Sequence, residues 1–187
     1  MGCRRQRRAA ETARLGGEWQ RDALLRDSRL QSRVTHPHPE CVAASALVNA
    51  AIHFLLHGHS PGNAVARALK AIDVPPALRS VVEAAPRRER DELPNSGWVR
   101  HTIESALWGL LTTDSFVDAA ISVVNLGNDA DTAGTVVGAL AGAAYGLDAI
   151  PPGWRQVVHG EWPLGSGVRL RDKELVALAD RLVSEGA

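Results

Sequence analysis

Residues 124–146 read VNLGNDADTAGTVVGALAGAAYG, a turn rich in oxygen-bearing side chains followed by an uncharged helix. After Asp131 no charged residue occurs as far as Tyr145, which is the pattern of a buried helix. Each glycine inside a helix costs about 1 kcal/mol relative to alanine, so a repeated glycine needs compensation. We expect a neighbouring helix to approach closely along the glycine stripe. The stripe consists of Gly134, Gly138, Gly142 and Gly146.

Two carboxylates and a hydroxyl gather in the turn itself. Residues two apart do not share a face of a regular helix, so we expect Asp129 in the loop and Asp131 at the start of the helix. With Thr132 they offer hard oxygen donors without sulfur or imidazole, a set that favours magnesium, calcium or manganese over zinc or copper. We assign magnesium. The alternative is that Asp131 and Thr132 only cap the helix and bind no metal.

Apolar and amphipathic segments on both sides of this stretch predict further helices. They span about residues 41–56, 62–72, 76–85, 100–111, 116–126 and 172–183, and the charged run 86–94 predicts a surface loop. No segment alternates as a strand would, so the predicted fold class is all-α. Residues 1–34 are polar and weakly periodic, which predicts a frayed helix or a disordered segment outside the core. The helical domain is assigned to residues 35–187.

The composition of the chain, 45% hydrophobic and 22% charged, is that of a globular protein. Basic and acidic residues both number 21, so no general attraction to nucleic acid or to an anionic membrane is expected. No run of eighteen apolar residues predicts a membrane span. Cys3 and Cys41 lie in unlike surroundings, which argues against a disulfide framework. We therefore expect a cytoplasmic protein.

Two other groups of side chains have alternative interpretations. His53, His57 and His59 lie close together in the sequence, but no acid separates the first two as a zinc-protease motif requires. We interpret them as a polar stripe on a mostly buried helix. Cys41 follows His36 and His38 and could form a thiol–imidazole pair with either, but it opens an apolar helix and is interpreted as a small core residue.

The acidic turn, the glycine stripe and the segment Ile150-Pro151-Pro152-Gly153-Trp154 together resemble the signature of the ADP-ribosylglycohydrolase family. Three upstream segments resemble the same family in the same order. They are Thr35-His36-Pro37-His38-Pro39, the run from Ser96-Gly97-Trp98 to Trp108, and Thr113-Asp114-Ser115-Phe116. The similarity covers about residues 35–154 and corresponds to the carboxy-terminal part of that family's compact helical fold.

The resemblance implies a magnesium-dependent hydrolase that cleaves a glycosidic ADP-ribose linkage. It implies a two-ion site that holds the ribose, with Asp129, Asp131 and Thr132 as ligands on one side. His36 is then expected near the substrate, and Trp98 in the pocket wall, although Trp98 is equally well interpreted as an ordinary loop aromatic. The expected partner is ADP-ribose or an ADP-ribosylated substrate.

The sequence departs from the family in its amino-terminal part. The amino-terminal glycine- and acid-containing segment and the Thr-Asp-Asp motif, which ligate the same metals from the opposite side, do not occur here. The expectation is therefore a fold truncated at its amino terminus, with self-association or a complementing chain to cover apolar helix faces. The alternative function is a catalytically inactive protein of the same fold that binds ADP-ribose or acts in an interaction.

Overall fold

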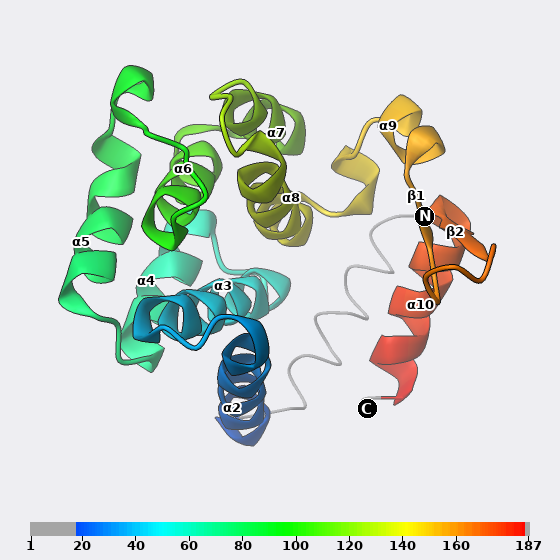
Figure 1. Ribbon diagram of the computed structural model, residues 1–187, viewed down its shortest axis with the longest axis horizontal. Helices are drawn as coiled ribbons and strands as arrows, with labels where there is room; N and C mark the ends of the chain where they lie inside the picture. The colour runs from blue at the N-terminus through cyan, green and yellow to red at the C-terminus, as the bar shows by residue number, and fades with distance from the viewer. Residues whose placement is uncertain (1–17, 186–187) are drawn as a thin grey trace.

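The computed structural model describes residues 18–185 and consists of helices with one small sheet (Figure 1). The helices are α2 (Glu18–Thr35), α3 (Pro39–Leu56), α4 (Pro61–Ala71), α5 (Pro76–Ala84), α6 (Val99–Thr112), α7 (Phe116–Val124), α8 (Ala130–Tyr145), α9 (Pro152–Val157) and α10 (Asp172–Glu185). Single 3-10 turns lie at Ala85–Arg87, Arg90–Glu92 and Leu147–Ala149. The predicted all-α fold class is confirmed.

Helix α3 lies at the centre of the bundle, in contact with α2, α4, α6 and α8. Ala46, Leu47 and Ala50 are buried on it, and the small alanine side chains let several helices pack around one. Among the described helices, α3 is also the one long and apolar enough to suit a membrane span, but 56% of its 18 residues are buried inside the protein. That burial is the property of a core helix.

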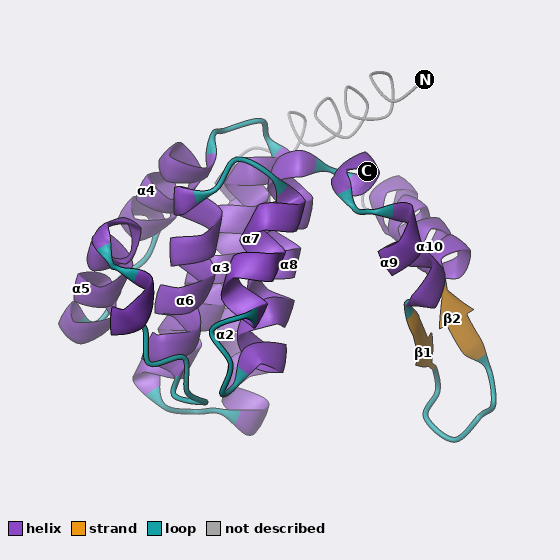
Figure 2. Ribbon diagram, turned by 90° about the horizontal axis from the view of Figure 1, so that it is seen from above, coloured by secondary structure: helices purple, strands orange, loops and turns teal. Residues whose placement is uncertain are grey.

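Helices α6, α7 and α8 form the part of the bundle that carries the acidic turn (Figures 1 and 2). The closest approach is at Gly109 of α6, where an added Cβ would lie 2.4 Å from Cγ2 of Val123. On α8, a Cβ added at Gly134 would lie 3.1 Å from Cγ2 of Val124, but a Cβ added at Gly138 or Gly142 would meet no described atom within 4 Å beyond the nearby backbone of α8 itself. Within residues 18–185, the predicted close approach along the glycine stripe is therefore wrong at these two positions.

The second half of the predicted amino-terminal segment is helix α2, which packs against α3. Leu25 is buried in the main core, so the expectation that this segment lies outside the core is wrong there. The side chain of Asn49 in α3 donates a hydrogen bond of 2.8 Å to the Ser28 hydroxyl of α2. Residues 1–17 are outside the described part of the chain, and the prediction of a frayed helix or a disordered segment stays a prediction there.

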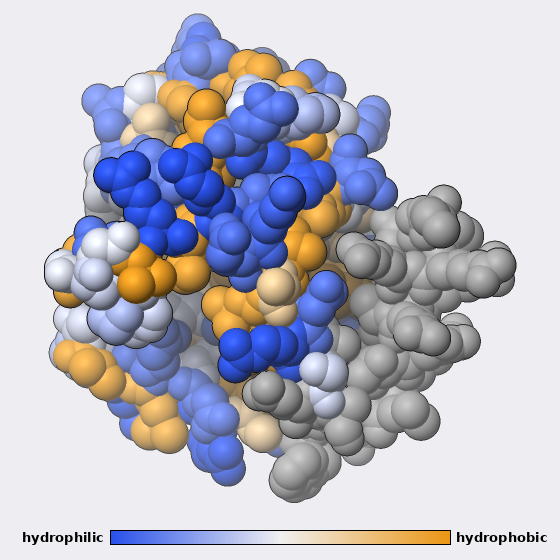
Figure 3. Space-filling view, turned by 90° about the vertical axis from the view of Figure 1, so that its right-hand side faces the viewer, coloured by the Kyte–Doolittle hydropathy of each residue, from blue (hydrophilic) through white to orange (hydrophobic). Residues whose placement is uncertain are grey.

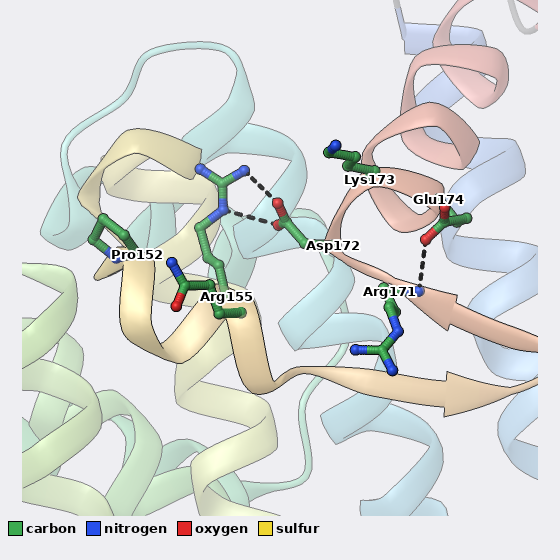
Figure 4. Close-up of a pocket in the computed structure, with 7 residues that line it drawn as sticks. Pro152, Arg155, Arg171, Asp172, Lys173 and Glu174 are labelled. Carbon is green, nitrogen blue, oxygen red and sulfur yellow. Dashed lines mark hydrogen bonds and ion pairs between the residues drawn. The ribbon is translucent and has the colours of Figure 1, made fainter.

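Residues 152–185 stand to one side of the bundle in both views (Figures 1 and 2). Strands β1 (His159–Glu161) and β2 (Arg169–Arg171) pair antiparallel, with Gly160 opposite Leu170. The sequence analysis predicted no strand, because three residues are too few to show an alternating pattern. Arg155 of α9 donates two hydrogen bonds to Asp172, at 2.8 and 2.7 Å, and so fixes the start of α10 (Figure 4).

This side of the molecule exposes large apolar side chains. Figure 3 views it directly and shows hydrophobic surface interleaved with hydrophilic residues. The exposed residues include Val157, Trp162, Leu164, Leu178 and Leu182. The ring of Trp154 meets Phe116 of α7 in a T-shaped contact with 6.2 Å between ring centroids, which links α9 to the bundle.

Candidate functional site

The acidic turn joins α7 to α8 and places its donors as expected. Asp129 is the residue before α8, and Asp131 lies in the first turn of that helix. The Thr132 hydroxyl donates a hydrogen bond of 2.8 Å to Oδ1 of Asp129. The Asp129 side chain makes no capping hydrogen bond to the helix backbone, which disfavours a role for it as a simple cap. The turn therefore presents oxygen donors that the helix itself does not use.

The shape of the turn depends on two residues with left-handed backbone. Gly127 has φ +74° and Asn128 has φ +52°. Glycine adopts this conformation without steric cost, and asparagine does so more readily than other residues with a side chain. The chain can therefore reverse between the end of α7 and the start of α8 within a few residues, which brings Asp129 to the amino end of α8.

A second loop, residues 95–98, packs against the acidic turn. The backbone N–H of Asp129 donates a hydrogen bond of 3.1 Å to the Asn95 carbonyl. The Asn95 side chain is fully buried and donates a hydrogen bond of 2.6 Å to the carbonyl of Gly127. A Cβ added at Gly97 would lie 3.3 Å from Oδ2 of Asp129. The sequence analysis missed Asn95, although an asparagine between Pro94 and Ser96 is a loop signal.

Trp98 ends this loop and immediately precedes α6. It is 48% exposed, an unusual degree for such a large apolar ring. The Arg100 guanidinium lies over the Trp98 ring at 4.4 Å from its centroid, and the ring of His101 meets it at a steep angle with centroids 5.0 Å apart. The His101 ring also forms a hydrogen bond of 2.7 Å with Ser96. Trp98 is thus a partly exposed aromatic that packs on Arg100 and His101, at the end of the loop that contacts the acidic turn.

His36 lies in the exposed connection between α2 and α3. Its Nδ1 is 2.9 Å from the Thr35 hydroxyl. Among the described residues it has no hydrogen bond, ion pair or ring contact with the acidic turn. A link between the two regions runs instead through Glu40 near the start of α3, which pairs with Arg100. The structure therefore brings the loop that ends at Trp98 against the acidic turn through Asn95 and Gly97, and leaves His36 in the connection before α3.

The charge around the acidic turn can be followed over the described part of the chain. Among residues 18–185, no lysine, arginine or histidine forms an ion pair with Asp129 or Asp131. Both carboxylates lie at the amino end of α8, where the backbone dipoles carry partial positive charge. The described residues bring no third acidic, histidine or cysteine side chain to the turn. The available donors are thus two carboxylates and one hydroxyl, a set that fits a hard divalent cation.

The histidines near the end of α3 are arranged differently from a metal site. The rings of His53 and His57 lie with centroids 4.1 Å apart, and the nitrogen Nδ1 of His57 is 2.7 Å from the His53 carbonyl. No group of three potential metal ligands is found among the described residues. Partial burial, together with the nearby His57, lowers the pKa of His53. The polar stripe remains the better interpretation.

Fold and site together define an all-helical protein with an oxygen-donor turn and an exposed aromatic at the ends of two core helices. The chain matches the ADP-ribosylglycohydrolase family over residues 2–187, and it belongs to that family.

Two curated relatives are ADP-ribosylarginine hydrolases named Tri1. The protein of Pseudomonas putida (strain GB-1) is 35% identical over 132 residues, which are 71% of this chain and 35% of the relative. The protein of Serratia proteamaculans (strain 568) is 36% identical over 128 residues, which are 68% of this chain and 35% of the relative. This chain therefore spans about a third of the length of these relatives.

One solved structure, titled ADP-ribosylglycohydrolase-related protein complex, is similar with a TM-score of 0.62 and 35% sequence identity. The similarity covers 72% of this chain and 47% of that one. The predicted resemblance to this family and to its fold is thereby confirmed.

Proposed function

We propose that this chain is a magnesium-dependent hydrolase that cleaves a glycosidic ADP-ribose linkage, with Asp129, Asp131 and Thr132 as metal ligands. The observation that carries the proposal is the pair of carboxylates at the start of α8, which form no ion pair with any residue between 18 and 185. Family membership supports the reaction class. The cytoplasmic location expected from the composition belongs to the same proposal.

In this proposal some of the described residues hold the metal and others contact the nucleotide. Bound magnesium would hold the ribose and polarise it for attack by water at the anomeric carbon. Thr132 fixes Oδ1 of Asp129 by a hydrogen bond, and Asn95 holds the turn by its side chain and its carbonyl. Trp98 offers an aromatic surface on which a nucleotide base can stack. His36 has the role of a substrate contact at the start of α3.

We propose a nitrogen-linked ADP-ribose on arginine as the bond that is cleaved. Both relatives named above are called ADP-ribosylarginine hydrolases. Hydrolysis of this bond releases arginine with its guanidinium intact, so an assay of the released products can test the proposal directly. Free arginine is released from ADP-ribosylarginine in a one-to-one ratio with ADP-ribose, whereas a serine-linked substrate should remain intact.

Magnesium takes six oxygen ligands, and the turn supplies three. The remaining ligands come from water, from substrate or from a complementing chain, and the last of these is part of the proposal. Exposed apolar side chains on α10, among them Leu175, Leu178 and Leu182, support association with a second chain or self-association. Light scattering of the purified chain tests self-association, and a monomer at all concentrations would contradict that part of the proposal.

The test of the main proposal is calorimetric titration of ADP-ribose into the chain, first with magnesium and then with chelator. We expect binding that requires magnesium and is lost in Asp129→Asn and in Asp131→Asn. The matched control is Asp118→Asn, because Asp118 is an exposed acid in the first turn of α7. Equal losses in the control and in the two site variants would contradict the assignment of the metal ligands.

The second candidate function is ADP-ribose binding without hydrolysis. It is favoured because the turn supplies only three of the six ligands that magnesium takes. A metal that the protein encloses incompletely polarises its substrate less effectively. Turnover of ADP-ribosylarginine by protein that binds ADP-ribose separates the two functions. Binding with no release of arginine would select the second.

A further inference from the structure

The start of α3 and the start of α6 are joined by an ion pair between a buried carboxylate and a partly exposed guanidinium. Arg100 donates two hydrogen bonds to Glu40, from Nε to Oε2 at 2.8 Å and from the second guanidinium nitrogen to Oε1 at 2.5 Å. Glu40 is 7% exposed, so it carries its charge inside the bundle. A bidentate pair fixes the plane of the guanidinium as well as its position. The guanidinium of Arg100 is therefore held in one orientation by α3.

The same guanidinium lies over the ring of Trp98, with 4.4 Å between its central carbon and the ring centroid. A planar cation stacked on an indole is attracted by the negative face of the ring. Trp98 precedes α6 and is 48% exposed, so the bundle alone does not enclose its side chain. The orientation of the ring thus depends on a group whose own orientation is set by a buried carboxylate.

We infer that Glu40 and Arg100 are positioning residues that hold the half-exposed ring of Trp98 ready to stack against the base of the bound nucleotide. This inference rests on the proposed function for its ligand. A ring that is ordered before binding loses less conformational entropy when the base arrives. The pair also connects the start of α3, which follows Thr35 and His36 in the chain, to the start of α6.

A matched control is available in a second ion pair, whose carboxylate also lies on α6. Arg88 pairs with Glu104 of α6, at 2.7 Å from Nε to Oε1, and Glu104 is as deeply buried as Glu40. The Arg88 guanidinium makes no cation–π contact among the described residues. Arg88→Lys therefore weakens an ion pair to a buried carboxylate and leaves the aromatic rings untouched. Arg100→Lys weakens such an ion pair and also removes the guanidinium from the face of the Trp98 ring.

The first measurement is fluorine NMR of protein labelled with 5-fluorotryptophan, with the Trp98 resonance assigned from Trp98→Phe. We expect Arg100→Lys to shift and narrow the Trp98 resonance, because lysine keeps the charge but cannot stack as a plane. Arg88→Lys should leave that resonance unchanged. An unchanged Trp98 resonance in Arg100→Lys overturns the inference, whether or not the protein binds ADP-ribose.

The second measurement compares two ligands in the presence of magnesium. ADP-ribose carries the base and ribose 5-phosphate does not. We expect Arg100→Lys to weaken ADP-ribose binding about tenfold, within the range of base–aromatic stacking, and to leave ribose 5-phosphate binding unchanged. Arg88→Lys should change neither. The nucleotide part of the inference is overturned if Arg100→Lys weakens the binding of both ligands equally, or if it weakens the binding of neither. If the wild-type protein binds neither ligand, the proposed function fails, and a Trp98 shift would then support only the positioning of the ring.

Discussion

The backbone N–H of Asp129 donates a hydrogen bond of 3.1 Å to the carbonyl of Asn95, which lies 34 residues earlier in the chain. The Asn95 side chain donates a second bond, of 2.6 Å, to the carbonyl of Gly127. The loop before α6 thus holds the acidic turn at two points. Both of these bonds are made by Asn95, one through its backbone carbonyl and one through its side chain, so the geometry of the turn depends on this buried asparagine.

Removal of the Asn95 side chain should loosen this turn. Asn95 has φ +38°, so Asn95→Gly keeps the required backbone freedom while it deletes the hydrogen bond to Gly127. We expect a loss of about 0.5–1.5 kcal/mol in the free energy of unfolding, the usual net contribution of one hydrogen bond, because the Gly127 carbonyl is exposed and can bond to water instead. The control is Asn128→Gly, since Asn128 is exposed with φ +52° and bonds Pro94 weakly at 3.3 Å. Urea unfolding measures both, and equal effects would argue against the clamp.

Two glycines should respond to alanine in opposite directions. At Gly109 the new Cβ would meet Val123 at 2.4 Å and the Ala119 carbonyl at 3.1 Å, so overpacking should destabilise the protein by about 1–3 kcal/mol. At Gly138 nothing among the described residues lies within 4 Å, so alanine should stabilise α8 by up to about 1 kcal/mol. Thermal unfolding of both variants tests this. A destabilised Gly138→Ala would show that the glycine stripe is covered after all.

A methyl group at Gly97 should disturb the metal site more than the fold. The added Cβ would lie 3.3 Å from Oδ2 of Asp129, a tight contact that the carboxylate can relieve by moving. We expect magnesium binding to weaken several-fold, while the free energy of unfolding changes by less than about 0.5 kcal/mol. Gly153→Ala is the control, because its Cβ would meet nothing within 4 Å. Unaltered magnesium affinity in Gly97→Ala would count against Asp129 as a ligand.

The Glu40–Arg100 pair should make stability depend on pH. The hydrogen bonds from Arg100 lower the pKa of Glu40 in the folded protein, although burial opposes this. A carboxyl with a lowered folded pKa stabilises the protein above its unfolded pKa of about 4.3, and this contribution is lost as the pH falls through the folded pKa. Glu40→Gln should therefore be less stable than wild type at pH 7, with a difference that narrows below about pH 4. Urea unfolding curves at several pH values measure it, and a constant difference would rule out this linkage.

Much of the fold could be predicted because its signals are local. The apolar periodicity gave the position of α3, α4, α6 and α8 to within one or two residues, since the pattern of a helix repeats over neighbouring turns. Asp129 before α8 and Asp131 in its first turn followed from the two-residue spacing of the acids. Strands β1 and β2 and the short α9 were missed, because segments of three to six residues are too short for a periodic signal.

The sequence by itself determined the helical class of this protein, the acidic turn and the family to which both belong. The tertiary structure alone decided that Asn95 holds this turn and that Gly109, and neither Gly138 nor Gly142, meets a close neighbour among the described residues. It also decided that Glu40 pairs with Arg100 across 60 residues. The physical reason is range: helix periodicity and capping act within about one or two turns, whereas these contacts depend on how whole helices pack.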